Sequence, residues 1–248
     1  MRGPFPSARM ISVIVLFYVF ACTTVEKAED KVLKAKEAPD SGFIQDPDQM
    51  KHDEDLPFNA VWYDHKVDWK QFHSIQIAPV NTHYLERMSW WDAVSFANLT
   101  ESERQHSVQK VAQYMRDRVS KAFADDPHDR LTVTDSTGPD TVVLEMALVE
   151  LVPTKAWQNT ITMLVIGAWS HGVVAMEARV REGSSGKVIV AFKDREFGKT
   201  AAISAADYTW YMHSTDIIDD WAKQMLEIIN AEPDERVKAA SPLNFRPW

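Results

Sequence analysis

An apolar run near the start of the chain ends at the single cysteine of the sequence. The run extends from Met10 to Ala21, follows two arginines and is followed at once by Cys22. A basic start, an apolar stretch and a small residue before a cleavage point are the layout of a secretory signal. We therefore predict a signal peptide over residues 1–21. A membrane-spanning helix is the alternative, but it requires about 20 apolar residues, more than this run contains.

Further along, several stretches show the alternation that is typical of β-strands. Between Ser74 and Val80, Ile75 and Ile77 fall on the same side of an extended chain. The stretch from Thr141 to Val152 is apolar on both faces, which indicates a strand at the centre of a sheet. The remaining predicted strands begin at Leu131 and run from Val173 to Arg181 and from Lys187 to Lys193, the last two forming a hairpin around a glycine-rich turn.

Two stretches repeat apolar residues at intervals of three and four, as amphipathic helices do. Thr100 and Glu103 form a capping box at the start of the first helix, and Asp125 marks its end. Its apolar stripe comprises Val108, Val111, Met115, Val119 and Ala122. The stripe of the second helix comprises Ile217, Ile218, Trp221, Met225, Ile228 and Ile229. We therefore predict an α/β (α+β) fold, a mainly antiparallel sheet with two helices on one face.

Composition divides the chain behind the leader into three parts. Residues 22–40 mix charges with Ala and Pro, a composition that buries too little apolar surface to fold, so we predict a flexible tether. Residues 41–232 are predicted to form a single globular domain. The domain starts with an irregular, acidic and extended arm from Ser41 to Trp69, whose aromatic residues we expect to pack onto the domain. Residues 233–248 are predicted to be a loose tail.

The charge and the cysteine content of the chain exclude two kinds of chemistry. Without residues 1–21 the chain keeps 27 − 2 = 25 basic residues against 36 acidic ones, a net charge of −11. Nucleic-acid binding requires a basic surplus or stripe, so we expect no nucleic-acid partner. One cysteine cannot form an internal disulfide, so burial of apolar side chains must stabilise the domain.

The residues around the cysteine, Val19-Phe20-Ala21-Cys22, resemble the lipobox of bacterial lipoproteins. This resemblance implies that Cys22 becomes the new N-terminus and carries covalent diacylglyceryl and acyl groups, which hold the protein on a bilayer. Thr23 follows the cysteine, and by resemblance to lipoprotein sorting in Gram-negative bacteria it implies the periplasmic face of the outer membrane. A conventional signal peptide that leaves a free thiol at Cys22 is the alternative.

Seven short motifs follow one another along the rest of the chain. They are Ser41-Gly42-Phe43-Ile44, Asp68-Trp69-Lys70-Gln71-Phe72, Ile75-Gln76-Ile77-Ala78-Pro79-Val80, Gly138-Pro139-Asp140-Thr141, Met176-Glu177-Ala178, Ser185-Gly186-Lys187 and Asp220-Trp221-Ala222. In this order they resemble a family of bacterial envelope lipoproteins catalogued as domain of unknown function thirty-three thirteen. The resemblance covers Ser41 to Ala231 and implies a lipoprotein with no known reaction. The order of elements also looks like the small α/β domain of curli-secretion lipoproteins, which is an analogy of fold alone.

Motifs for catalysis and cofactor binding are missing from the sequence. The acidic stretch that starts at Asp46 has Lys51 where an EF-hand loop needs glycine, so we predict a solvated acidic loop and no metal site. The sequence contains no G-x-S-x-G elbow, no G-x-G-x-x-G fingerprint and no P-loop. We therefore expect no enzyme activity, no bound nucleotide and no cofactor apart from the covalent lipid.

The leading hypothesis is a non-enzymatic lipoprotein, anchored in the outer membrane, whose periplasmic domain binds another envelope protein. The candidate contacts are Trp62, Tyr63, Trp90, Trp91 and Trp169, because Trp and Tyr often carry interface energy. Packing in the core is the alternative for each. The apolar stretch from Thr160 to Gly172 is either a contact surface or a buried element. Two further hypotheses are a binding module for a small apolar or lipid ligand, and an accessory subunit of a secretion or efflux assembly.

Overall fold

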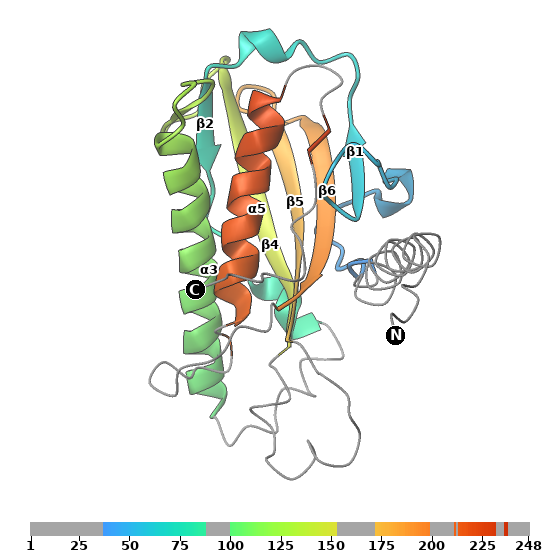
Figure 1. Cartoon of the computed structure of the whole chain (residues 1–248), viewed down its shortest axis with the longest axis vertical. Helices are drawn as coiled ribbons and strands as arrows, with labels where there is room; N and C mark the ends of the chain where they lie inside the picture. The colour runs from blue at the N-terminus through green and yellow to red at the C-terminus, as the bar shows by residue number, and fades with distance from the viewer. Residues whose placement is uncertain are drawn as a thin grey trace, which may run out of the picture. The chain divides into compact units, whose positions relative to one another are not determined.

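A computed structural model describes residues 37–87, 100–152, 172–198, 211, 213–231 and 236–237. The chain divides into two compact units, Met1–Ala35 and Lys36–Trp248, and every described residue belongs to the second. The described part of this unit contains one sheet of six strands and two α-helices (Figure 1). The predicted α+β class is therefore confirmed.

The sheet is mixed, with antiparallel pairing over most of its width. Its strands are β1 (Ala60–Tyr63), β2 (Ser74–Ile77), β3 (Thr132–Val133), β4 (Thr141–Val152), β5 (Val173–Glu182) and β6 (Val188–Phe197), arranged in the order β1-β6-β5-β4-β2-β3. The pairs that join β1, β6, β5 and β4 are antiparallel, whereas β2 lies parallel to both β4 and β3. Parallel strands require a long crossover connection, and the first α-helix lies in the connection between β2 and β3.

Helix α3 (Glu101–Ala124) begins at the capping box that the sequence indicates. Thr100 Oγ1 accepts a hydrogen bond from the Glu103 amide at 3.3 Å, and the Glu103 carboxylate accepts one from the Thr100 amide at 2.7 Å. These bonds satisfy amide groups that the first helical turn leaves unpaired. The helix ends at Ala124, and Asp125 is its C-cap.

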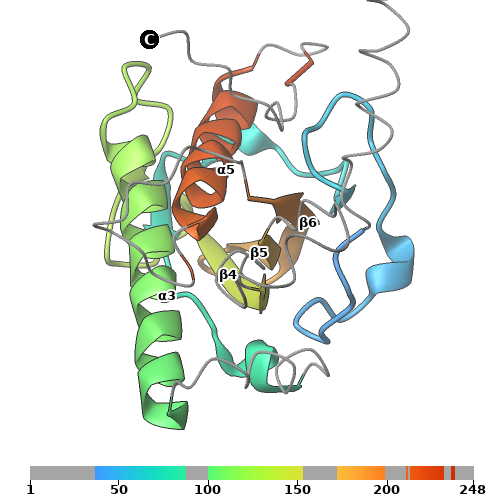
Figure 2. The same ribbon diagram turned by 60° about the horizontal axis from the view of Figure 1, so that its bottom comes forward.

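Helix α5 (His213–Asn230) lies beside α3 on the same face of the sheet, as Figures 1 and 2 show. Asp219 of α5 accepts hydrogen bonds from the Tyr114 hydroxyl at 2.8 Å and from Arg118 Nε at 2.6 Å, both of α3. Burial, together with the hydrogen bond to Asp219, raises the pKa of Tyr114 to about 12. The hydroxyl therefore stays protonated and serves as a donor between the two helices.

The space between the two helices and the sheet is filled by side chains. Trp221 of α5 is 1% exposed and lies in one cluster with apolar residues of both helices and of the sheet. Other fully buried members are Leu85, Met115, Val119, Met146, Leu148, Leu151, Met176, Ile189 and Ile218. Both predicted apolar stripes thus face the core, with Ala122, Ile228 and Ile229 at its margin.

The other face of the central strands is covered by the N-terminal part of the arm. Ala38, Phe43 and Ile44 form a second buried cluster with Ala147, Val149, Ala175 and Ala191 of the sheet. This cover explains why β4 is buried on both faces, since it has the helices on one side and residues 38–44 on the other.

The arm contains an edge strand that the sequence pattern did not indicate. Strand β1 pairs with β6 in the register Ala60 to Lys193, and it is only four residues long. Its sequence shows no alternation of apolar and polar residues, so periodicity could not reveal it. Next to it, Phe58 stacks on Phe192 with ring centroids 4.4 Å apart, as expected for a packed arm aromatic. The described residues also form three 3₁₀ helices, η1 (Pro47–Gln49), η2 (Trp69–Gln71) and η3 (His83–Arg87).

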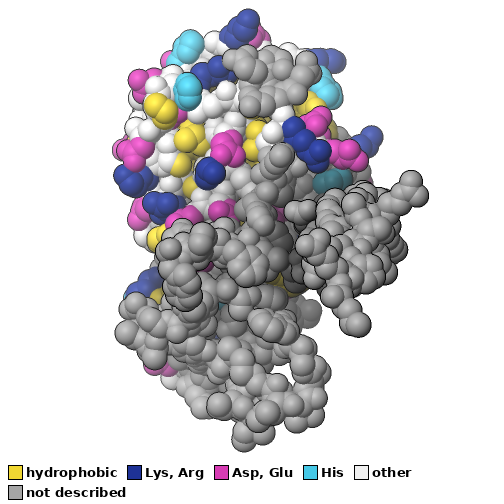
Figure 3. Space-filling model, viewed as in Figure 1, with side chains coloured by type: hydrophobic (Ala, Val, Ile, Leu, Met, Phe, Trp, Pro, Cys, Tyr) yellow, Lys and Arg dark blue, Asp and Glu magenta, His cyan; other side chains and the backbone are white. Residues whose placement is uncertain are grey.

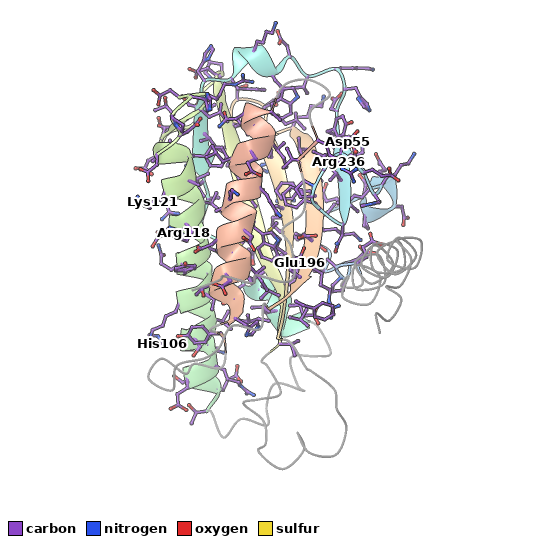
Figure 4. The ribbon with its side chains drawn as sticks, in the orientation of Figure 1. Asp55, His106, Arg118, Lys121, Glu196 and Arg236 are labelled. Atoms are coloured by element: carbon purple, nitrogen blue, oxygen red, sulfur yellow. The ribbon has the colours of Figure 1, made fainter. Side chains whose placement is uncertain are left out.

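Two residues of the predicted C-terminal tail are described, and they lie against the arm. The Val237 amide donates a hydrogen bond to the Asp55 carbonyl at 3.0 Å, and the Val237 side chain is buried. Figure 4 shows Arg236 and Asp55 close together beside β1. At these two residues the tail is therefore in contact with the domain.

Candidate interaction surface

The two faces of the sheet differ in chemistry. We call residues 37–44 the strap, and the sheet face beneath it the strap face. Because successive residues of a strand point to opposite sides, many charged residues of β4, β5 and β6 lie on the strap face, whereas the large apolar residues of these strands face the helices. The charged members of the strap face include Glu145, Glu150, Glu177, Arg179, Arg181, Lys193 and Arg195, and its buried apolar members are Ala147, Val149, Ala175 and Ala191.

The carboxylate of Glu177 holds the strap from below. It is 1% exposed, and it accepts hydrogen bonds from the Ser41 amide at 2.7 Å, the Ser41 hydroxyl at 2.8 Å and the Ile44 amide at 3.0 Å. A buried carboxylate is costly unless such donors satisfy it. Gly42 has a positive φ of 89°, which lets the strap turn so that both amides point at one carboxylate.

Arg179 binds the strap beside Glu177. Its Nη1 donates to the Phe43 carbonyl at 3.1 Å, and its guanidinium carbon lies 4.5 Å from the centre of the Phe43 ring. Its Nε donates to Glu145 at 2.6 Å, which fixes the guanidinium plane. The Phe43 ring also meets Tyr84 edge to face, at 5.5 Å between centroids. The aromatic residue of the strap is therefore held by a cation–π contact and an aromatic contact.

Lys193 holds the acidic end of the strap. Its ammonium lies 2.8 Å from Asp40 and 2.9 Å from Glu37, and the residue is 5% exposed. Burial opposes the charge on Lys193, but the hydrogen bonds to Asp40 and Glu37 outweigh it and raise the pKa of the ammonium. Residues 37–40, the last four of the predicted tether, thus contact the domain.

The neighbouring residue in β6, Asp194, makes its contacts on the helix side. Its carboxylate is 1% exposed and accepts hydrogen bonds from Trp221 Nε1 at 2.8 Å and from the Asn59 amide at 3.0 Å. Asp194 thus ties α5 to the arm just before β1. Lys193 and Asp194 are neighbours in β6 and point to opposite faces of the sheet. Lys193 binds the strap on one face, and Asp194 binds Asn59 and Trp221 on the other.

Two of the predicted contact residues lie in β1, and they differ in exposure. Trp62 is partly buried and packs against the cluster that the strap forms with the sheet. Tyr63 is 38% exposed, and the centroid of its ring lies 4.6 Å from that of His65. Trp69 in η2, which was not among the predicted contacts, is 40% exposed. Tyr63 and Trp69 are the large apolar or aromatic side chains that the described part of the chain leaves exposed.

The other predicted site residues lie outside the described residues. They are Cys22, Trp90, Trp91 and Trp169, and the same holds for residues 160–171 of the apolar stretch. Of the described residues, no three His, Cys, Asp or Glu side chains are grouped so that they could hold a metal ion. No described helix has the length and apolarity to cross a membrane.

Buried apolar side chains of α3, α5 and the sheet form one cluster between the helices and the sheet. A hollow of about 310 Å³ lies between η3 and the first turns of α3. It is lined by Thr82, Leu85, Ser102, Gln105, His106, Val108 and Gln109. His106 points away from the sheet at this end of α3 (Figure 4). On the side shown in Figure 3, acidic and basic side chains of the described residues are interspersed.

Sequence analysis did not identify the residues that hold the strap. Glu177 stands between Met176 and Ala178, and Lys193 follows Phe192, so each is a charged residue next to apolar ones within a strand, which is the signal that marks them. A charge within a buried strand needs a partner, but the sequence does not say which segment supplies it. Here the partner of Glu177 lies 136 residues away.

His213 is a half-buried titratable residue at the start of α5. Its ring lies between Gly172 and Gly198, so close that a Cβ on Gly172 would come within 2.4 Å of it. Gly198 also donates to the Gly172 carbonyl at 2.7 Å, which draws the two backbone segments together. Burial lowers the pKa of His213 to about 4, and a contact with the Val173 backbone offsets this only in part.

Comparison by sequence identifies one family that the chain matches. A family model described as protein of unknown function, DUF3313, matches residues 39–225. The matched region begins within the strap and ends within α5. No curated protein matches the chain by sequence.

The solved structures that resemble this chain in backbone fold have low sequence identity to it. PelC from Paraburkholderia phytofirmans, solved as a dodecamer, is 8% identical with a TM-score of 0.33, covering 64% of this chain and 91% of that one. A DUF330 protein from Xanthomonas campestris is 11% identical with a TM-score of 0.36, covering 68% and 91%. The hypothetical protein CT253 from Chlamydia trachomatis is 9% identical with a TM-score of 0.30, covering 63% and 91%. Similarity at this level carries no inference about what this chain binds.

The lowered pKa of His213 predicts a loss of stability in mild acid. The unfolded imidazole binds a proton below about pH 6.5, whereas the folded one stays neutral down to about pH 4. Stability therefore falls as the pH drops through this window, by about 2 kcal/mol between pH 7 and pH 5. Urea unfolding of wild type and His213→Gln at both pH values checks this. The variant should lose less stability than wild type, and an exposed control, His73→Gln, should behave like wild type; equal losses in all three proteins would contradict the assignment.

Proposed function

This chain belongs to the DUF3313 family of proteins of unknown function, and we propose that it is a non-enzymatic lipoprotein whose domain binds another envelope protein. Lipidated Cys22 anchors it to the periplasmic face of the outer membrane. The layout of residues 1–21 and the lipobox resemblance support the anchor. The exposed aromatic residues of the arm support the binding surface.

The strap sets how far the domain can lie from its anchor. Glu177 and Lys193 hold residues 37–44 on the sheet, so the free tether comprises at most residues 22–36. Fifteen residues span at most about 50 Å when fully extended. On this proposal the domain works close to the membrane surface, within reach of partners that are embedded in it or attached to it.

One observation carries the choice of binding surface, the exposure of Tyr63 and Trp69 on the arm. Both residues are more than a third exposed, whereas the other large apolar side chains of the described chain are buried or half-buried. Exposed aromatic residues supply large contact area at low cost in side-chain entropy, and Tyr and Trp are enriched among residues that dominate interface energies. We therefore propose that the segment of the arm from Tyr63 in β1 to Trp69 in η2 contacts the partner.

Replacing the cysteine tests the anchor. Wild type should sediment with outer membranes, and its mature N-terminal peptide should carry the mass of a diacylglyceryl group and an acyl group on Cys22. Cys22→Ser should accumulate as the uncleaved form and lose the lipid mass, since the thiol that accepts the lipid is gone. Membrane fractionation and mass spectrometry of the N-terminal peptide measure both. Cleavage of the Cys22→Ser variant at the same bond, with wild type carrying no lipid, would support a conventional signal peptide instead.

Site-specific photocrosslinking in cells tests the binding surface. A photoreactive phenylalanine analogue at Tyr63 or Trp69 should give one discrete crosslinked envelope protein, because these positions lie within the proposed contact. The matched control is the same analogue at Lys121, a residue of α3 whose side chain is 63% exposed (Figure 4). Crosslinks at Lys121 to the same protein would contradict a partner on the segment from Tyr63 to Trp69. The absence of crosslinks at both Tyr63 and Trp69 would contradict it as well.

A further inference from the structure

The strap face has a composition that could be exposed to water at low cost in free energy. Beneath the strap, the central strands present alanines and charged residues instead of the large apolar residues that face the helices. Glu150 and Arg195 pair with each other there, with Nε and Nη2 of the arginine 2.5 and 3.1 Å from the two carboxylate oxygens. If the strap moved away, the charged residues would regain hydration, and only a few apolar groups would be exposed.

The strap is held by side chains and not by strand pairing. Among the described residues, 37–44 take no part in the sheet, and their main-chain groups are bound by Glu177, Arg179 and Asn59. The Asn59 contact runs from the Ala38 amide to Oδ1 at 3.2 Å. The sheet thus binds a defined set of groups in the strap. They are two carboxylates, two main-chain amides around a glycine turn, a main-chain carbonyl and an aromatic ring.

We propose that the strap face is a peptide-binding site, and that the strap is its displaceable occupant within the same chain. The ligand is an acidic peptide that reproduces this pattern, with carboxylates for Lys193, a serine-glycine turn for Glu177 and an aromatic residue for Arg179. The site does not depend on the lipid anchor or on the β1 edge. Displacement lengthens the free tether by the eight residues of the strap, 37–44, and uncovers the strap face.

Peptide titration into the full chain tests the proposal. The probe is a fluorescent peptide with the sequence of residues 36–46, and its anisotropy reports binding. Wild type should bind it weakly, because the strap is present at an effective concentration of about millimolar. The variant Ser41→Ala with Phe43→Ala weakens the strap in place and should bind the peptide about tenfold more tightly or better. A folded double variant that binds no better than wild type overturns the proposal.

A matched pair of substitutions tests which carboxylate recognises the peptide. Added to the double variant, Glu177→Gln should weaken peptide binding by about tenfold, because the acceptor for the turn amides is lost. Glu150→Gln is the same change on the same face, and within the described residues Glu150 pairs with Arg195 and makes no hydrogen bond to the strap, so peptide binding should stay unchanged. Equal effects of the two changes would mean that the peptide is not bound at Glu177, and this overturns the proposal.

Hydrogen exchange of the wild-type full chain keeps the proposal testable if the double variant fails to fold. The amides of Ser41 and Ile44, which donate to Glu177, should exchange about a hundredfold faster than amides in the middle of β5, because the strap opens without unfolding the sheet. If the strap amides exchange only as fast as those of β5, the strap opens with global unfolding. That result overturns the proposal.

Discussion

The hydrogen bonds that the buried Glu177 carboxylate accepts are the interaction on which the cover of the strap face depends. The carboxylate lies at the centre of β5, in a sheet that is covered on both sides, so water cannot solvate it. The strap supplies the donors that take the place of water, and Gly42 provides the turn that aims them. The path of residues 41–44 across the sheet follows from these hydrogen bonds.

The fold thus combines two different kinds of packing around one sheet. On one face, α3 and α5 bury a continuous apolar cluster, which gives the domain its stability. On the other face, the strap covers alanines and charged residues through hydrogen bonds and ion pairs. The family match, residues 39–225, includes residues 39–44 of the strap, all of α3 and most of α5.

Sequence analysis could predict the elements whose signals are local. The capping box of α3, the apolar stripes of both helices and the two apolar faces of β4 are each encoded within a few turns or residues, and the structure has them at the predicted places. Strand β1 was missed because four residues without alternation give no periodic signal. The strap site was missed for another reason. The motifs at Ser41–Ile44 and Met176–Ala178 were both visible, but only the fold brings them together.

A double-mutant cycle between Glu177 and Ser41 tests the central claim most directly. Urea unfolding would be measured for wild type, Glu177→Gln, Ser41→Ala and the double variant. Each single change should cost about 1–3 kcal/mol, because it removes a partner from a buried hydrogen bond to a charged group. The double variant should cost less than the sum of the two by about 1 kcal/mol or more, since both changes break the same contact. Strictly additive costs would show that the carboxylate and the strap are energetically independent, and this would contradict the account.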